Sequence, residues 1–134
     1  MAPQLKAIDH IHVFVADRQT ASVWYETVLG LKPLPELEFW AADGGPLTVA
    51  DRTGSIHIAL FEASAAECRS TIALSVDASG FLSWKEHLYK TLGHNVNAVD
   101  HVVSWSLYFT DPDANPYEIT SYEYEAIRDA FGFL

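Results

Sequence analysis

The chain has 134 residues, of which 49% are hydrophobic, so it is long enough for one domain with a substantial apolar core. Its 18 acidic and 8 basic residues give a formal net charge of −10, which argues against nucleic acid or an anionic membrane surface as a partner. The longest apolar runs are too short to span a bilayer, and Met1–Lys6 lacks the pattern of a signal peptide. The single cysteine, Cys68, allows no internal disulfide, so we expect a cytoplasmic protein.

The first half of the chain predicts a strand, a helix and three further strands. Ala7–Val15 alternates with the period-two pattern of a strand, with His10 and His12 on one face. The following helix is expected to begin at Asp17, a good N-cap, and to end before Gly30. Turns rich in glycine then separate three strands, expected at Phe39–Ala42, Leu47–Ala50 and Ser55–Glu62.

The second half repeats this order. A polar linker at Ala63–Ser70 divides a first module, about residues 7–62, from a second, about residues 71–122, and residues 123–134 form a C-terminal tail. The second module is expected to contain a helix that ends before Gly93 and strands at Thr71–Val76, Val96–Val99, Ser104–Thr110 and Tyr117–Tyr122. The sequence therefore predicts an α+β fold in which tandem βαβββ modules form a single domain, residues 1–134.

Polar residues occupy matching positions in the two modules. His10 and Thr71 lie 61 residues apart, and so do His57 and Glu118. Two modules related by a pseudo-twofold axis would place these four residues at equivalent points of one cavity. Three of the four are metal-ligand types, and a divalent cation would offset the cost of burying Glu118.

The chain resembles the vicinal oxygen chelate superfamily, which includes glyoxalase I, fosfomycin and bleomycin resistance proteins, and extradiol ring-cleavage dioxygenases. The resemblance runs from IDHIHVFVADRQTASVWYETVLGL at Ile8–Leu31 to DPDANPYEI at Asp111–Ile119. It implies paired βαβββ modules with an open β-barrel-like cavity, which holds a divalent metal that grips two adjacent substrate oxygens. It also implies a homodimer, because members of the superfamily commonly dimerise. In the turn of the DPDANPYEI segment, we expect Asn115 to take a positive φ.

The resemblance implies His10 as the first-strand ligand and Glu118 as the last-strand ligand of the metal. His57 lies on the fourth strand, where glyoxalase-like members place a ligand, although an alignment shifted by two residues puts Ala59 there. Thr71 stands where most metal-dependent members have histidine, so a set of two histidines and one glutamate needs His57 as the second imidazole. Fe(II) or Mn(II) is favoured, with Zn(II) or Ni(II) as alternatives.

A narrower resemblance covers Asp100–Glu118, which is similar to the closing segment of extradiol dioxygenases. In those enzymes an active-site histidine and tyrosine precede the glutamate ligand, and the pair hydrogen-bonds the substrate oxygens and helps to manage protons. His101 and Tyr108 match the two positions. The resemblance therefore implies His101 as the acid/base and Tyr108 as a substrate-binding group.

Each candidate residue also has a purely structural interpretation. His10 and His57 could be strand histidines whose rings are satisfied by polar neighbours. His12, Trp40 and Thr71, the candidate substrate-binding residues, could pack the sheet instead.

The residues and the resemblance together predict a metal-dependent vicinal oxygen chelate enzyme, with ring-cleavage dioxygenase-like activity on a small aromatic diol. A glyoxalase-like isomerase or lyase is the first alternative. A metal-free protein that binds a small molecule, like the antibiotic-sequestering resistance members, is the second. Thr71 favours that second alternative, since it removes one expected ligand, and an acidic chain with aromatic residues suits a planar or cationic ligand.

Overall fold

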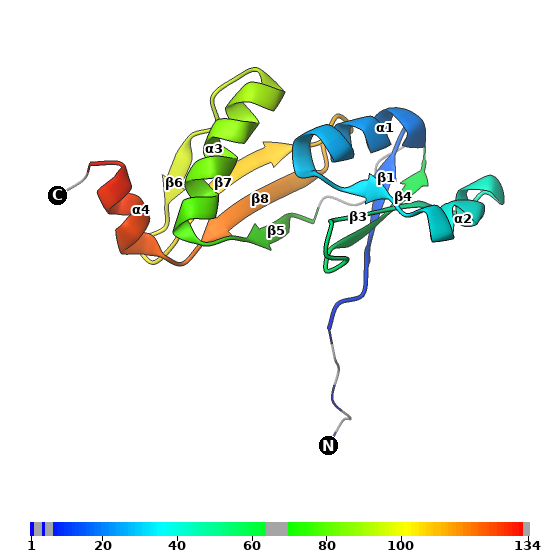
Figure 1. Cartoon of the computed structure of the whole chain (residues 1–134), viewed down its shortest axis with the longest axis horizontal. Coiled ribbons are helices and arrows are strands. Elements are labelled where there is room, and N and C mark those ends of the chain that lie inside the picture. The colour runs from blue at the N-terminus through cyan, green and yellow to red at the C-terminus, as the bar shows by residue number, and fades with distance from the viewer. Residues whose placement is uncertain (2–3, 5–6, 64–69, 133–134) are drawn as a thin grey trace. The chain divides into compact units, whose positions relative to one another are not determined.

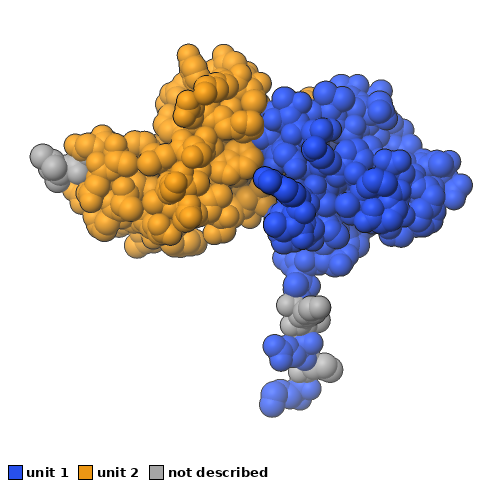
Figure 2. All heavy atoms as spheres, in the orientation of Figure 1, with its two compact units in different colours: residues 1–68 blue, residues 69–134 orange. Residues whose placement is uncertain are grey.

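The computed structural model describes residues 1, 4, 7–63 and 70–132, and it contains helices and two four-stranded sheets (Figure 1). The chain divides into two compact units, unit 1 at residues 1–68 and unit 2 at residues 69–134, which Figure 2 colours separately. Each unit is one βαβββ module, which confirms the predicted α+β fold class. No helix in the described ranges is long and apolar enough to cross a membrane. Cys68 and most of the expected linker lie outside the described residues.

Unit 1 contains the elements β1 (Ile11–Val15), α1 (Arg18–Trp24), the π-helical turn η1 (Tyr25–Leu29), β2 (Lys32–Pro33), the 3-10 turn η2 (Pro35–Leu37), α2 (Glu38–Ala42), β3 (Leu47–Ala50) and β4 (His57–Glu62). Its sheet has the order β1-β4-β3-β2, in which β1 is parallel to β4 and the other neighbours are antiparallel.

The prediction of one strand in unit 1 is wrong. Phe39–Ala42 belongs to helix α2, and the second strand of the module is the short β2 instead. The physical reason lies in the residues just before. Pro35 stands at the start of η2, where its fixed φ suits a helical turn. The acidic residues Glu36 and Glu38 occupy the first turns of η2 and α2, where a negative charge interacts favourably with the helix dipole.

The core of unit 1 lies between the helix and one face of the sheet. Alternation along the strands turns Val13, Val15, Ile58 and Leu60 to this side, and all four are buried. Tyr25, Val28 and Leu29 of η1 are buried as well, and α1 contacts β4. The same alternation turns His12 and Phe61 to the opposite face of the sheet, which carries the pocket described below.

Unit 2 contains the elements β5 (Ile72–Ser75), α3 (Ala78–Leu92), β6 (Ala98–Asp100), β7 (Trp105–Thr110), β8 (Pro116–Ser121) and α4 (Tyr124–Ala130). Its sheet order, β5-β8-β7-β6, repeats that of unit 1. Helix α3 contacts β8 and α4 in the described structure (Figure 1). The segment expected as a tail thus contributes a packed helix, in which Ile127 is fully buried.

The turn between β7 and β8 also differs from the expectation. The positive φ belongs to Ala114, at 66°, and not to Asn115. Asn115 is buried and bound to Asp111, because its backbone N–H donates to Oδ1 and its side-chain Nδ2 to Oδ2, both at 2.8 Å. These two bonds fix Asn115, so the left-handed conformation falls on its small neighbour at a cost of about 1 kcal/mol.

The two units begin their helices in the same way. The Asp17 carboxylate caps α1 by accepting an N–H at 3.0 Å, and Glu62 Oε1 accepts the Arg18 N–H at 3.0 Å. In unit 2, Asp77 caps α3 at 2.7 Å, and Glu123 Oε1 accepts the first helical N–H at 3.2 Å. Each helix is therefore joined at its start to a carboxylate that ends or closely follows the fourth strand of its own module.

Candidate functional site

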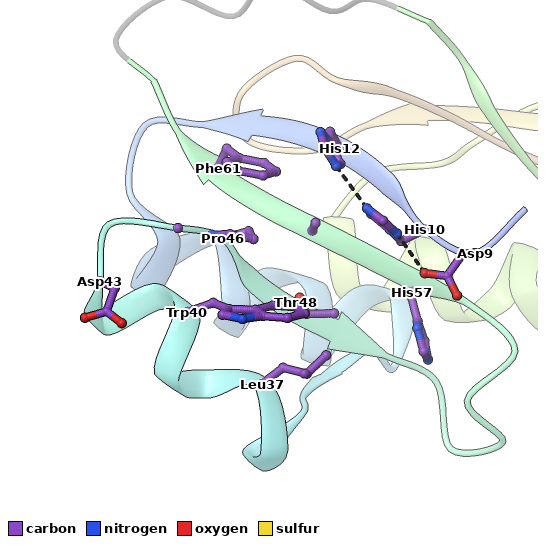
Figure 3. Close-up of a pocket in the computed structure, with 12 residues that line it drawn as sticks. Asp9, His10, His12, Leu37, Trp40, Asp43, Pro46, Thr48, His57 and Phe61 are labelled. Carbon is purple, nitrogen blue, oxygen red and sulfur yellow. Dashed lines mark hydrogen bonds and ion pairs between the residues drawn. The ribbon is translucent and has the colours of Figure 1, made fainter.

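Unit 1 carries a pocket of about 450 Å³ on the face of its sheet that lies away from the core (Figure 3). Its volume falls within the range of about 300–1,000 Å³ that is typical of small-molecule sites. The strands contribute His10, His12, His57 and Phe61 to its lining, and the α2 segment contributes Trp40 and Asp43. The predicted site residues of unit 1 thus share one pocket.

His10 lies between two polar partners at the entrance to β1. Its Nδ1 is 2.8 Å from Asp9 Oδ2, and its Nε2 is 3.0 Å from His12 Nε2. The two rings stack, with centroids 4.9 Å apart. When Nδ1–H donates to Asp9, Nε2 carries a lone pair, and His12 Nε2–H donates to it. A carboxylate on the far nitrogen is the arrangement that orients metal-binding histidines in proteins.

His57 lines the same pocket but does not join the His10–His12 pair. Extending the β1–β4 register by one residue places His57 beside His10. Its ring is nevertheless directed toward the turn that precedes β4, where its Nε2 lies 3.9 Å from the position of a Cβ on Gly54. In Figure 3 the His57 ring points away from His10 and His12. Among the described residues, no three His, Cys, Asp or Glu side chains gather closely enough to hold a metal ion.

The strand registers of the two units differ by two residues. In unit 1, His12 pairs with Ala59. In unit 2, Ala73, which follows His12 by 61 residues, pairs with Glu118. The two matches at a spacing of 61 residues therefore cannot both hold, and with the first strands matched at that spacing the counterpart of Glu118 in unit 1 is Ala59, as in the shifted alignment. The ligand role of His57 itself stays a prediction.

Unit 2 gathers three of the polar candidates on the face of its sheet that lies away from α3. Tyr108 pairs directly with Glu118 across β7 and β8. The His101 Nε2 atom lies 2.9 Å from the Tyr108 hydroxyl, and either atom can donate, depending on the tautomer of the ring. Ser106, which is fully buried, donates its hydroxyl to Glu118 Oε1 at 2.6 Å.

Sequence reasoning missed Ser106. Its only signal is the strand period, because residue 106 must share a face with Tyr108, two positions later. The hydrogen bond from Ser106 holds one carboxylate oxygen of Glu118 in place and leaves the other oxygen free of that bond. Thr71, by contrast, is exposed and precedes β5.

A strained turn holds His101 between β6 and β7. Val102 has a φ of 72°, which is unusual for a β-branched residue. The turn is closed by the Val102 N–H, which donates to Asp100 Oδ1 at 2.8 Å, and by the His101 N–H, which donates to the Ser104 carbonyl at 2.8 Å. Such strain persists where the surrounding structure enforces it, and it is common beside functional groups.

Arg18 anchors the α2 wall of the unit 1 pocket. Its guanidinium donates to the carbonyl of Gly45 and to that of Ala41, the latter at 3.2 Å, and its Nε lies 3.7 Å from Glu62 Oε1. Only 20% of the Arg18 side chain is exposed. The segment that carries Trp40 is thereby tied to the start of α1.

The model of the Glyoxalase/Bleomycin resistance protein/Dioxygenase superfamily matches residues 7–119. The chain belongs to this superfamily. The match confirms the family resemblance that the sequence motifs indicate, and it covers both βαβββ modules. No curated protein matches the chain.

Solved structures of superfamily type share the fold at low sequence identity. A glyoxalase/dioxygenase from Nostoc punctiforme is 21% identical with a TM-score of 0.68, and the match covers 90% of this chain and 94% of that one. A mutant of the fosfomycin resistance protein FosX from Listeria monocytogenes, in complex with Mn(II) and dihydroxypropylphosphonic acid, is 16% identical with a TM-score of 0.70, over 92% and 97%. The oxidase ChaP-H2 is 16% identical with a TM-score of 0.68, over 88% and 94%.

Proposed function

We propose that this superfamily member is a metal-dependent enzyme that cleaves the ring of a small aromatic diol in the extradiol manner. The observation that carries the proposal is the hydrogen bond of 2.9 Å between His101 and Tyr108, directly across the strand pair from Glu118. An imidazole and a phenol in contact can bind a hydroxylated substrate and pass a proton between them. Extradiol ring cleavage places both atoms of O2 in the product, so it needs no external reductant.

The residues of unit 2 supply distinct parts of this chemistry. His101 acts as the acid/base through Nε2, because that atom already exchanges a hydrogen bond with a phenol. The Tyr108 hydroxyl binds a substrate oxygen. Ser106 orients the Glu118 carboxylate through the bond to Oε1.

The donor chemistry of the chain fits a divalent metal. The Asp9 contact to Nδ1 keeps the His10 Nε2 lone pair directed away from Asp9, and a metal would take the place of the His12 N–H that this lone pair accepts at 3.0 Å. Imidazole nitrogen is a ligand type for Fe(II), Mn(II), Zn(II) and Ni(II). His10, His57 and Glu118 stay the predicted ligands, with Fe(II) or Mn(II) favoured. When bound, the metal supplies a Lewis acid for two adjacent oxygens of the diol.

Two alternative functions are also supported by particular residues. A metal-free binding protein is favoured by exposed Thr71 in place of a histidine and by the lack of a three-ligand group among the described side chains. A glyoxalase-like isomerase or lyase is the alternative enzyme. It is less favoured, because Ala59 supplies no carboxylate at the unit 1 position that corresponds to Glu118. A single domain, a homodimer and a cytoplasmic location also stay predictions.

Metal titration of the purified protein tests the proposal. We expect stoichiometric binding of Fe(II) or Mn(II) that is lost in His10→Ala, His57→Ala and Glu118→Ala. His94→Ala is the matched control, because His94 is exposed beyond the end of α3 and should leave affinity unchanged. If the wild-type protein binds none of Fe(II), Mn(II), Zn(II) and Ni(II), that result would overturn the metal-dependent enzyme and favour a metal-free binding protein.

Oxygen uptake with catechol then tests the reaction. His101→Ala should lower kcat by about a hundredfold or more while metal affinity is retained, since general acid–base groups contribute about 10²–10⁴. Tyr108→Phe removes only the hydroxyl and should raise KM as well as lower kcat. Equal activity in wild type and His101→Ala would remove His101 from the mechanism.

A further inference from the structure

The unit 1 pocket has the shape of a slot with an aromatic ring on each side. On the strand side, the rings of His12 and Phe61 lie with centroids 4.6 Å apart. On the α2 side, Trp40 lies across the pocket from both of them (Figure 3). Aromatic rings on two sides favour a flat ring over a bulky aliphatic group, because a planar ligand can lie between the two walls.

The two ends of this slot differ in charge, because Asp9 contacts His10 at 2.8 Å on the histidine side, whereas Asp43 lies at the other end. Asp9 and Asp43 line it at opposite ends in Figure 3, and the described lining residues include no lysine or arginine. Arg18 lies behind the α2 wall, but its donors are directed to the carbonyls of Ala41 and Gly45. At the Asp43 end of the slot, away from His10 and His57 in Figure 3, an anionic substituent would therefore meet a carboxylate, whereas a cation would gain both charge attraction and contact with Trp40.

We propose that this pocket selects aromatic diols whose side chain is neutral or cationic and rejects those that carry a carboxylate, with Asp43 as the specificity-determining residue. The proposal rests on the proposed function for the diol, but the charge preference follows from the pocket alone. It separates this chain from FosX, whose solved complex holds a phosphonic acid. Asp43 is exposed, so its effect is that of a surface charge, up to about fivefold in affinity.

Calorimetric binding to the full chain tests this selection with three probes that share one diol. Catechol is neutral, dopamine carries an ammonium, and protocatechuate carries a carboxylate. We expect dopamine to bind up to about fivefold more tightly than catechol, and protocatechuate more weakly than either. The difference should shrink at high salt, since it arises between exposed charges.

Variants of the α2 wall assign the effect to single residues. Asp43→Asn should reduce the advantage of dopamine over catechol, and Asp43→Lys should make protocatechuate the tighter ligand of the two charged probes. Glu36→Gln removes an exposed carboxylate from the neighbouring η2 without touching the pocket lining, so it should change nothing. Trp40→Leu should weaken all three probes, and dopamine most, because dopamine also loses the contact between its ammonium group and the indole ring.

The outcomes separate this inference from the proposed function. Selective binding without oxygen uptake would refute the ring cleavage and retain the charge selection. Turnover with protocatechuate bound as tightly as dopamine would refute the selection and retain the enzyme. An unchanged preference in Asp43→Asn would remove Asp43 as its source, and no binding of any probe would overturn the diol pocket itself.

Discussion

Replacing Arg18 by methionine should loosen the α2 wall of the pocket. Methionine keeps the apolar stem of the side chain but removes the donors to the carbonyls of Gly45 and Ala41. Hydrogen bonds to charged groups contribute about 1.5–3 kcal/mol each, and water can reach part of this site, so we expect Arg18→Met to lower the free energy of unfolding by about 2–3 kcal/mol. Urea denaturation at equilibrium measures this loss.

Glu62→Gln is the control that separates the carbonyl bonds from the ion pair. The Arg18–Glu62 pair is 3.7 Å long and Glu62 is 47% exposed, so its loss should cost at most about 1 kcal/mol. A glutamine oxygen can still accept the Arg18 N–H at the start of α1. Hydrogen exchange should quicken at Gly45 in Arg18→Met but not in Glu62→Gln. Equal losses of stability in the two variants would refute the anchoring role of the carbonyl bonds.

Two further predictions concern turns. Partial burial raises the pKa of Asp51, but hydrogen bonds from Thr53, Ile56 and Ser55 outweigh it and lower the pKa from 3.8 to about 2. A carboxyl whose pKa is lower in the folded state stabilises the protein above its unfolded pKa, and this stabilisation is lost as pH falls through the folded pKa. Asp51→Asn should therefore cost about 1 kcal/mol at neutral pH, and most of this difference should be gone in urea melts at pH 2. Val102→Gly should raise the melting temperature through a gain of about 1 kcal/mol, since glycine adopts a φ of 72° without strain; a lower melting temperature would contradict this.

The parts of the fold that follow local rules could be predicted from the sequence. Asp17 caps α1 because its side chain accepts a helical N–H, and Gly30 ends the following turn because it adopts a φ of 72° freely. The alternation in Ala7–Val15 predicts which residues of β1 face the core. Each of these features depends on residues only a few positions apart, so a single sequence is enough to predict it.

The parts that depend on contacts between distant segments could not be predicted. The helical state of Phe39–Ala42 depends on the turn started by Pro35, which competes with the β-forming aromatic residues. The two-residue difference in register is set where β4 meets β1, and no local pattern distinguishes the alignment of His57 from that of Ala59.

The candidate site shows the same division. His101 and Tyr108 could be paired from their place in a motif, and the structure brings them into hydrogen-bonding contact. Asp43 and Arg18 could not be found in this way. Their roles arise only when the α2 segment folds over the sheet and turns its carbonyl groups toward α1.

Ala59 has a consequence for how this chain can evolve. It occupies in unit 1 the position that Glu118 occupies in unit 2, and its methyl group lines the pocket. A single base change turns the alanine codons GCA and GCG into glutamate codons, so from either of them Ala59→Glu would add a carboxylate to that wall in one mutational step. The chain is thus one substitution away from a new potential metal ligand, at a position that is now only 2% exposed and where a carboxylate would need a cationic partner.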